Sequence, residues 1–308
     1  MNVIDKLTNR ELVLMDGATG TELERRGVPM NDKNWSGVAV YSHPEIVQAV
    51  HEEYLDIGAD VITTNTFATS RFSLTDVGLG DKTREINTNA VTLAKRARDN
   101  RAGNRDVWVA GSLSSVIFKR NPTAYILFEE LCDHGREMIE IFAENEADVI
   151  VLEMVRDINF ILAMVDVTVD VGLPIWVGFT SHQDEQGQTR LSRRKSTMDY
   201  GVLDDALSRL VQHPGMRRAG CAINTMHTDI QDTTPALERI VTHWDGPAGA
   251  YPNSGGFTMP NWQFVDIISP EAFVQECQGW RDMGATILGG CCGIGPEHIQ
   301  LLKEHLFS

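Results

Sequence analysis

The repeated alternation of short apolar runs with helix-forming stretches restricts the fold of this chain more than any other feature. Apolar runs of strand length occur at residues 12–15, 59–67, 107–113, 148–152, 174–180, 220–225, 248–254 and 285–290. Helix-forming stretches follow at 43–57, 84–100, 128–146, 158–171, 203–213, 230–243, 271–283 and 296–306. Such alternation requires a parallel sheet covered by helices. Eight units, with no Pro/Ser-rich linker between halves, predict a single (β/α)8 barrel domain over residues 1–308 in preference to an open doubly wound sheet.

The predicted strand ends carry small, polar or thiol-bearing residues. In (β/α)8 barrels the chemistry takes place at the C-terminal ends of the strands. The residues that fall there are Asp16, Asn65, Thr66, Ser112, Glu153, Thr180, Asn224, Thr225, Asn253, Cys291 and Cys292. Because nearly every strand contributes one of them, we expect one continuous site.

Two adjacent cysteines within a glycine frame, GGCCG at residues 289–293, follow the last predicted strand. Pro296 stands where a helix would begin, so the cysteines occupy a strand-to-helix turn. At such a turn neighbouring side chains need not point to opposite faces, and both sulfurs can approach one ion. Thiolates bind zinc well. The alternative is that Cys291 and Cys292 are buried as small apolar residues.

Composition excludes several classes of function. A formal net charge of −16 argues against a nucleic-acid partner, since phosphate binding needs a basic face. No run is apolar and long enough to cross a bilayer, and residues 1–11 lack the apolar core of a signal peptide. Five cysteines, an odd number, do not resemble a disulfide framework. We therefore expect a protein of the reducing cytoplasm.

The sequence resembles the homocysteine S-methyltransferases, a family that includes the S-methylmethionine- and betaine-dependent enzymes and the homocysteine domain of cobalamin-dependent methionine synthase. The matching segments are DGATGT at 16–21, NTF at 65–67, AGS at 110–112, LE at 152–153, YPNSG at 251–255 and GGCCG at 289–293, with Pro296, His298 and Ile299. They run in family order along essentially the whole chain. Members of the family are (β/α)8 barrels, which agrees with the strand count.

The resemblance implies methyl transfer from a small onium donor, S-methylmethionine- or betaine-like, to the thiol of homocysteine in methionine biosynthesis. It implies a zinc ion held by Cys291 and Cys292, and an ammonium group of the substrate held by Asp16 and Glu153. We assign Asn65, Thr66 and Asn224 to the same substrate site. No glycine fingerprint for a nucleotide precedes a helix, so the donor need not be S-adenosylmethionine. The chain is too short to hold a cobalamin module beside the barrel.

One departure from the family concerns the third zinc ligand. The family has a cysteine after the asparagine at the end of strand six, and here Thr225 stands at that place. Cys221, about 13 Å down the strand, is interpreted as core. His227 either fills the gap with its imidazole or is a solvated loop histidine. With two thiolates and a weaker third ligand, zinc would be bound more weakly than by three cysteines, or not at all.

Further departures leave the substrates open. The family commonly continues strand three with a Gly–Pro pair, where this chain has residues 112–116 as SLSSV, and Met154 stands where hydroxyl-bearing residues are found. The polar stretch 181–196 is a loop that could cover the site. Alternatives to the homocysteine reaction are demethylation of another methylated metabolite by a different thiol, and a barrel that binds small molecules without catalysis.

Overall fold

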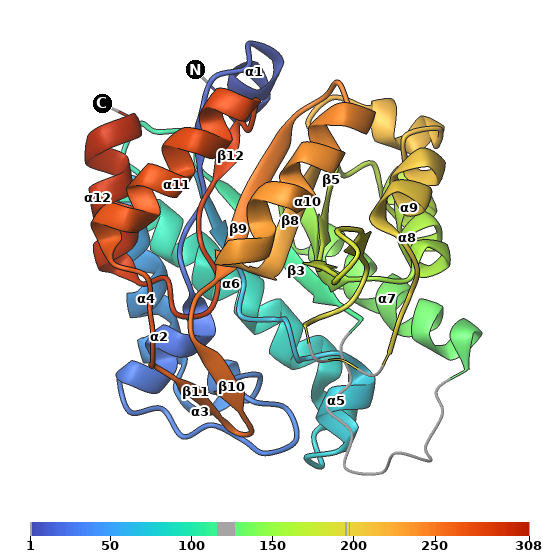
Figure 1. Ribbon diagram of the computed structural model, residues 1–308. Coiled ribbons are helices and arrows are strands. Elements are labelled where there is room, and N and C mark those ends of the chain that lie inside the picture. The colour runs from blue at the N-terminus through green and yellow to red at the C-terminus, as the bar shows by residue number, and fades with distance from the viewer. Residues whose placement is uncertain (1, 116–126, 195, 197, 308) are drawn as a thin grey trace.

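The computed structural model describes residues 2–115, 127–194, 196 and 198–307, and its centre is a barrel of eight parallel strands (Figure 1). The strands are β1 (Val13–Leu14), β2 (Val61–Thr63), β3 (Trp108–Ser114), β4 (Val149–Val155), β5 (Ile175–Phe179), β8 (Ala222–Asp229), β9 (Ala248–Asn253) and β12 (Ile287–Leu288). They are hydrogen-bonded in the order β1-β12-β9-β8-β5-β4-β3-β2. A parallel bridge between Met15 and Val61 joins β1 to β2. The predicted single-domain (β/α)8 barrel is confirmed.

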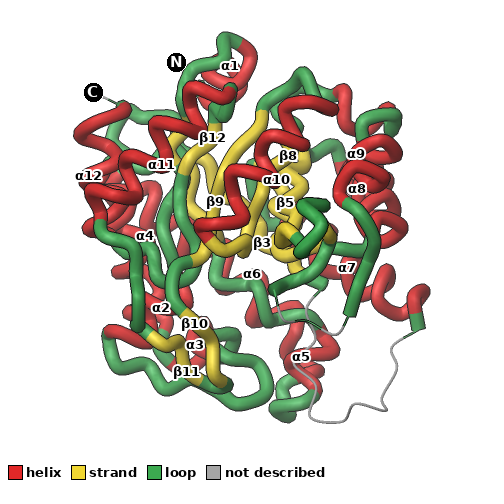
Figure 2. The backbone as a smooth tube through the Cα atoms, in the orientation of Figure 1, coloured by secondary structure: helices red, strands yellow, loops and turns green. Residues whose placement is uncertain are grey.

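Helices follow the strands and surround the barrel (Figure 2). They are α1 (Val3–Thr8), α2 (Thr19–Arg25), α3 (Ala39–Ser42), α4 (Pro44–Ile57), α5 (Arg71–Thr75), α6 (Thr83–Arg101), α7 (Phe128–Glu144), α8 (Ile158–Val171), α9 (Leu203–Leu210), α10 (Ile230–His243), α11 (Pro270–Met283) and α12 (Pro296–Leu306). Two short 3₁₀ helices are η1 (Gly80–Lys82) and η2 (Pro214–Arg217). No helix of the described residues is long and apolar enough to cross a membrane.

Local sequence signals explain where the long helices begin and end. At α11 the hydroxyl of Ser269 accepts a hydrogen bond from the Ala272 amide, Pro270 occupies the first turn, and Gly284 ends the helix at φ 117°. Such caps satisfy amide and carbonyl groups that have no partner within the helix. The predicted helices 158–171, 230–243 and 296–306 are confirmed to the residue. The predicted helix 203–213 is too long, since α9 ends at Leu210.

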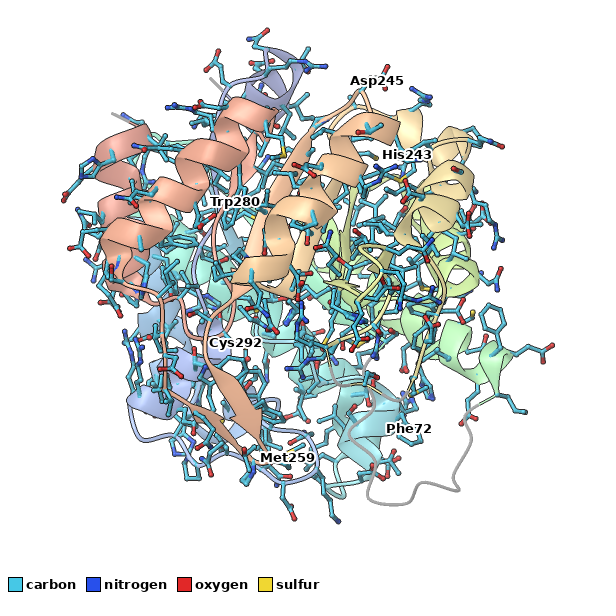
Figure 3. The ribbon with its side chains drawn as sticks, viewed as in Figure 1. Phe72, His243, Asp245, Met259, Trp280 and Cys292 are labelled. Atoms are coloured by element: carbon cyan, nitrogen blue, oxygen red, sulfur yellow. The ribbon has the colours of Figure 1, made fainter. Side chains whose placement is uncertain are left out.

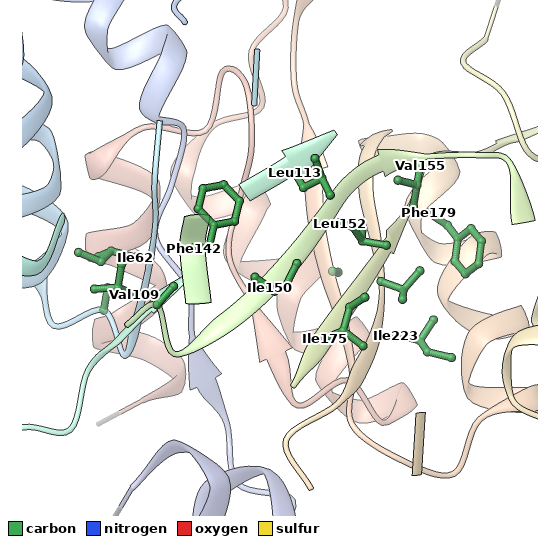
Figure 4. Packing of buried hydrophobic residues seen from close by; sticks show 14 of the residues in the cluster. Ile62, Val109, Leu113, Phe142, Ile150, Leu152, Val155, Ile175, Phe179 and Ile223 are labelled. Atoms are coloured by element: carbon green, nitrogen blue, oxygen red, sulfur yellow. The ribbon is translucent and has the colours of Figure 1, made fainter. Parts of the chain in front are cut away.

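Alternating side chains of the strands build two apolar layers. On β4, Val149 and Val151 pack inside the barrel, whereas Ile150 and Leu152 pack against the helices. Figure 4 shows part of the outer layer, including Ile150 and Leu152. Burial of each such aliphatic side chain contributes about 1.5–3 kcal/mol. The alternation holds along the body of each strand, whereas β4 and β8 each shift register near the mouth of the barrel.

Two hairpins extend from the C-terminal ends of the strands. One, β6 (His182–Gln183) with β7 (Thr189–Arg190), lies in the stretch that was predicted as a covering loop. The other, β10 (Gly256–Thr258) with β11 (Asn261–Gln263), follows β9 and is visible at the lower edge of Figure 1. Residues 112–116 differ from the Gly–Pro pair that the family commonly has after strand three, and the last of them, Val116, lies outside the described residues.

Candidate active site

The cysteine pair is held in a tight turn directly after β12. Gly293 has φ 84°, and a Cβ atom there would lie 1.9 Å from the carbonyl oxygen of Ser254. Only glycine fits this position without moving the backbone. The amide of Cys291 donates to the carbonyl of Pro252 at 2.8 Å, and the sulfurs of Cys291 and Cys292 are 3.9 Å apart. Figure 3 places Cys292 between the barrel and the β10–β11 hairpin. The turn thus directs both thiols to one point.

His227 completes a cluster with the two cysteines. Both ring nitrogens of His227 lie 3.5 Å from the sulfur of Cys291. The ligand atoms of His227, Cys291 and Cys292 all lie within 4.8 Å of one another. The imidazole is 6% exposed, so the interpretation of His227 as a solvated loop histidine is wrong. We call these three residues the Cys–His cluster.

A bulge in β8 turns His227 toward the cysteines. Ala222 and Met226 pack inside the barrel, so regular alternation would direct residue 227 outward. Instead His227 has φ 53°, and the pairing of β8 with β9 shifts register between Met226 and Asp229. A left-handed conformation costs a residue that is not glycine about 1–3 kcal/mol and is concentrated at functional sites.

Thr225 faces away from the Cys–His cluster. It is paired with Phe179 on β5, and Phe179 packs against the helices. Thr225 also stands two residues after Ile223, which packs on the same outer side of the barrel. Its hydroxyl donates to the hydroxyl of Thr228 at 3.0 Å. Cys221 shares this outer side, where it is buried near the carbonyl of Gly215, and its interpretation as core is confirmed. On strand six it is therefore residue 227, and not residue 225, that lies beside the two cysteines.

Glu153 and Phe67 fix the imidazole of His227. Nε2 of His227 lies 2.8 Å from Oε2 of Glu153, and both side chains are buried. The Phe67 ring stacks on the imidazole with centroids 5.1 Å apart. A carboxylate that accepts one ring N–H leaves the other nitrogen, Nδ1, free to bind a metal. Glu153 lies within β4, which continues beyond the predicted strand to Val155.

Two of the three donor-atom separations in the Cys–His cluster match those of a tetrahedral zinc site, and all its ligand atoms lie within 4.8 Å of one another. Zinc–sulfur and zinc–nitrogen bonds of about 2.3 and 2.05 Å at tetrahedral angles separate two sulfurs by about 3.8 Å, and sulfur from nitrogen by about 3.5 Å. The observed separations are 3.9 Å and 3.5 Å. Burial, reinforced by the neighbouring thiol of Cys292, raises the pKa of Cys291 well above its ordinary value. A cation in the cluster would offset that effect.

A narrow polar pocket, the inner cavity, lies beside the Cys–His cluster. Its lining includes the polar residues Thr19, Ser36, Thr63, Thr64, Asn65, Ser112, Glu153 and Tyr251. It shares Trp35, Phe67, His227 and Cys292 with the aromatic pocket described below. The hydroxyl of Ser112 is buried without a partner among the described residues, and so are both polar atoms of Asn224 on the inward side of β8. By contrast, Asn65 donates to the carbonyl of Ser36, and Thr66 donates to the carbonyl of Ser112. The side chains of Asn65 and Thr66 therefore also connect loops and strand ends through hydrogen bonds.

Asp16 lies at the end of β1 and is fully buried. Its carboxylate accepts hydrogen bonds from the amide and hydroxyl of Thr63 at 2.6 and 3.1 Å, and from the hydroxyl of Tyr251 at 3.0 Å. Burial outweighs these hydrogen bonds and raises the pKa of Asp16 to about 7. Thr63 and Tyr251, which donate these hydrogen bonds, both line the inner cavity. Asp16 itself does not line the cavity but lies directly behind these two residues.

An aromatic pocket, the outer cavity, opens on the other side of the Cys–His cluster. It has a volume of about 230 Å³. Its lining consists of Trp35, Phe67, Met154, Arg193, His227, Asn253, Phe257, Trp262 and Cys292. The rings of Trp35 and Phe257 meet edge to face at 6.0 Å. Sequence reasoning missed Trp35, Phe257 and Trp262, whose aromatic character was the available signal, because they lie outside the predicted strands and helices. Phe257 and Trp262 belong to the short β10–β11 hairpin.

Known proteins with similar sequences are methyltransferases. The selenocysteine methyltransferase of Astragalus bisulcatus is 27% identical over 324 aligned residues, which cover 95% of this chain and 91% of that protein. The homocysteine S-methyltransferase YbgG of Bacillus subtilis is 26% identical over 305 residues, covering 94% of this chain and 92% of that protein.

A solved structure agrees with the fold. The metallated form of the homocysteine methyltransferase MmuM from Escherichia coli matches with a TM-score of 0.78 and 23% identity, over 97% of this chain and 98% of that one. The sequence model of the family described as homocysteine S-methyltransferase matches residues 13–306. Because that match spans nearly the whole chain, the protein belongs to the homocysteine S-methyltransferase family.

Proposed function

We propose that this protein transfers a methyl group from a small onium donor to the thiol of homocysteine, which yields methionine. The observation that carries the proposal is the meeting of two unlike cavities at the Cys–His cluster, a polar inner one and an aromatic outer one. An amino-acid thiol suits the inner cavity and an onium group suits the outer cavity. The similarity to enzymes named for this reaction supports the assignment.

We propose that His227, Cys291 and Cys292 hold zinc, with Glu153 orienting the imidazole. When bound, the ion would supply Lewis acidity that lowers the pKa of the acceptor thiol. Three protein ligands with one open position are typical of catalytic zinc. Replacing one thiolate by a neutral imidazole removes one negative charge, so we expect weaker binding than by three cysteines. The solved metallated form of MmuM is consistent with a metal in this family.

The inner cavity offers groups for each end of the acceptor amino acid. Glu153 and, behind Thr63, Asp16 supply negative charge for the ammonium group. The hydroxyl of Ser112, which has no partner among the described residues, is a hydrogen-bond donor for the carboxylate, and Thr19 at the start of α2 lines the same cavity. With both ends held, the thiol is directed toward the Cys–His cluster, and orientation of this kind lowers the barrier of a bimolecular step.

The outer cavity suits the donor because aromatic faces attract a cation that has lost its water. In the reaction the acceptor sulfur forms a bond to the methyl carbon while the donor's carbon–sulfur or carbon–nitrogen bond breaks. The donor leaves as a neutral thioether or tertiary amine, and the thiol proton is released. Trp35, Phe257 and Trp262 exclude water from the transferred methyl group.

The test is an assay for methionine formation from homocysteine with S-methylmethionine, betaine and related sulfonium donors, under reducing conditions with added zinc. Turnover that is lost in Cys291→Ala supports the proposal, and absence of turnover with every donor would refute it. Turnover with a different thiol alone would indicate the demethylase alternative. Tight binding of onium compounds without product would indicate a binding barrel.

We also propose a reducing, cytoplasmic location and a single functional unit over residues 1–308. The five cysteines are all free, and the sulfurs of the vicinal pair are 3.9 Å apart and unbonded. Adjacent thiols at the mouth of a barrel are easily oxidised, so their function requires a reducing compartment.

A further inference from the structure

A further cavity, the basal cavity, lies at the end of the barrel opposite the Cys–His cluster. It has a volume of about 280 Å³, close to the lower end of the range for small-molecule sites. Its walls come from the end of α1 with Arg10, the turn between η2 and β8, and the turn between α10 and β9. Because Gly220 and Pro247 precede their strands, the cavity lies at the N-terminal ends of β8 and β9. Figure 3 shows Asp245, which lines it, near the upper edge of the molecule and Cys292 well below.

The basal cavity carries an excess of positive charge in an acidic protein. Arg10, Arg217 and Arg218 line it, and among the described residues Asp245 is its one acidic lining residue. Three positive charges against one negative charge give the lining a net charge of +2, whereas the whole chain has a formal net charge of −16. Like charges that are crowded together repel each other, so a bound anion would lower the electrostatic energy of this end of the barrel.

Most N–H donors of Arg10 and Arg217 are free to bind a ligand. A guanidinium has five such donors. Within the described part of the chain, Arg10 uses one of them, on the backbone carbonyl of Asp245 at 2.7 Å. Arg217 likewise uses one, on the carboxylate of Asp245 at 3.2 Å. Arg218 donates to uncharged oxygens and has no ion pair with the described residues, so its position is fixed while its charge is not neutralised.

The backbone at Arg10 gives an independent reason to assign a ligand. Arg10 has φ 56°, and its amide donates to the carbonyl of Leu7. The next amide, that of Glu11, donates to the carbonyl of Lys6. This is the left-handed turn that ends many helices, and glycine is its usual residue because a Cβ atom is unfavourable there. An arginine at this position is costly for the fold, and strained residues of this kind are concentrated at functional sites.

We propose that Arg10, Arg217 and Arg218 form a binding site for a phosphate group in the basal cavity. Arginine forks bind phosphate oxygens through parallel charge-assisted hydrogen bonds. A phosphate dianion also matches the net charge of the lining. The volume of the cavity leaves room for a small organic group beside the phosphate. The site is separate from the Cys–His cluster and does not depend on the function proposed above.

The test is isothermal titration calorimetry of the full-length protein with inorganic phosphate and with glycerol 3-phosphate, at pH 8 and constant ionic strength. The parent binds one phosphate group per chain with a Kd of about 1 mM or below. Arg10→Gly suits the left-handed backbone but removes the guanidinium, so it weakens binding about 10- to 100-fold, the range for a lost hydrogen bond to a charged group. Tighter binding of the ester would identify a phosphorylated metabolite as the ligand, and tighter binding of inorganic phosphate would identify the free ion.

Glu146→Gly is the matched control, because Glu146 has φ 60° at the same position after α7 and lies outside the basal cavity. It leaves the phosphate affinity unchanged. Asp245→Asn removes the carboxylate that pairs with Arg217, so it tightens phosphate binding about 2- to 5-fold, the size of an exposed ion pair. The proposal is overturned by a parent that shows no saturable binding at about 10 mM phosphate. Equal affinities of the parent and Arg10→Gly, or weaker binding by Asp245→Asn, would overturn it as well.

Discussion

Asp16 provides a quantitative test of the electrostatics beneath the inner cavity. Its carboxylate is fully buried, and its pKa is raised to about 7. In the unfolded chain the pKa is close to 3.8. Between these values the folded protein binds a proton that the unfolded chain has released. The group therefore stabilises the fold at low pH, and this contribution is lost as the pH rises through 7.

The size of the effect follows from the two pKa values. Integration of the proton-binding difference from pH 5 to pH 8 gives a loss of about 2.5 kcal/mol in the free energy of unfolding. Urea denaturation of the metal-free parent and of Asp16→Asn at both pH values measures it. Other groups titrate alike in the parent and in Asp16→Asn, so the informative quantity is the difference between the two proteins in the change of unfolding free energy from pH 5 to pH 8. Asp16→Asn does not show the loss of about 2.5 kcal/mol that is due to Asp16, whatever its absolute stability.

A second variant checks the physical cause. Tyr251→Phe removes one hydrogen bond to the ionised carboxylate, so it raises the pKa of Asp16 further and extends the loss of stability to higher pH. If the parent and Asp16→Asn instead change by the same amount within about 0.5 kcal/mol, the hydrogen bonds from Thr63 and Tyr251 keep Asp16 charged and the reasoning from burial is wrong.

Three further outcomes are expected. Glu153→Gln weakens the hold on His227 and lowers zinc affinity about 10- to 100-fold, measured by chelator competition; unchanged affinity would remove Glu153 from the metal site. Phe257→Ala raises KM for the onium donor about 2- to 30-fold and leaves KM for the acceptor thiol unchanged, whereas equal effects on both would contradict the division into two cavities. Gly293→Ala forces a Cβ atom toward the Ser254 carbonyl and destabilises the protein by about 3 kcal/mol in urea denaturation, and a neutral result would show that the turn is adaptable.

Much of the fold followed from the sequence because strand and helix periods are local properties. The barrel, the order of its elements and most long helices were predicted from apolar runs and caps. The short helices α1, α2, α3 and α5 were missed, and α2 begins at Thr19 within the DGATGT segment, where no helix was predicted. Helices of four to seven residues have little periodicity of their own and are stabilised by tertiary packing.

The site was predictable where strand ends determine it. Asp16, Glu153 and the cysteine pair stand near the barrel mouth because parallel strands bring their C-terminal ends together. The position of His227 could not be predicted, because regular alternation along β8 would direct its side chain outward. A bulge in β8 turns the side chain inward instead. The same rule directs Thr225 outward, although counting from the family motif had placed it at the metal. Arg193 lies in a loop whose path no periodicity describes.

The central claim is that His227, and not residue 225, completes the metal site. Its most direct test is the zinc content and zinc affinity of protein purified under reducing conditions, for the parent, His227→Ala and Thr225→Cys. We expect the parent to bind one zinc ion per chain and His227→Ala to weaken binding at least 100-fold. Because residue 225 pairs with Phe179 on the outer side of the barrel, Thr225→Cys changes neither affinity nor turnover. Zinc binding that survives in His227→Ala, or that rises together with turnover in Thr225→Cys, would contradict it.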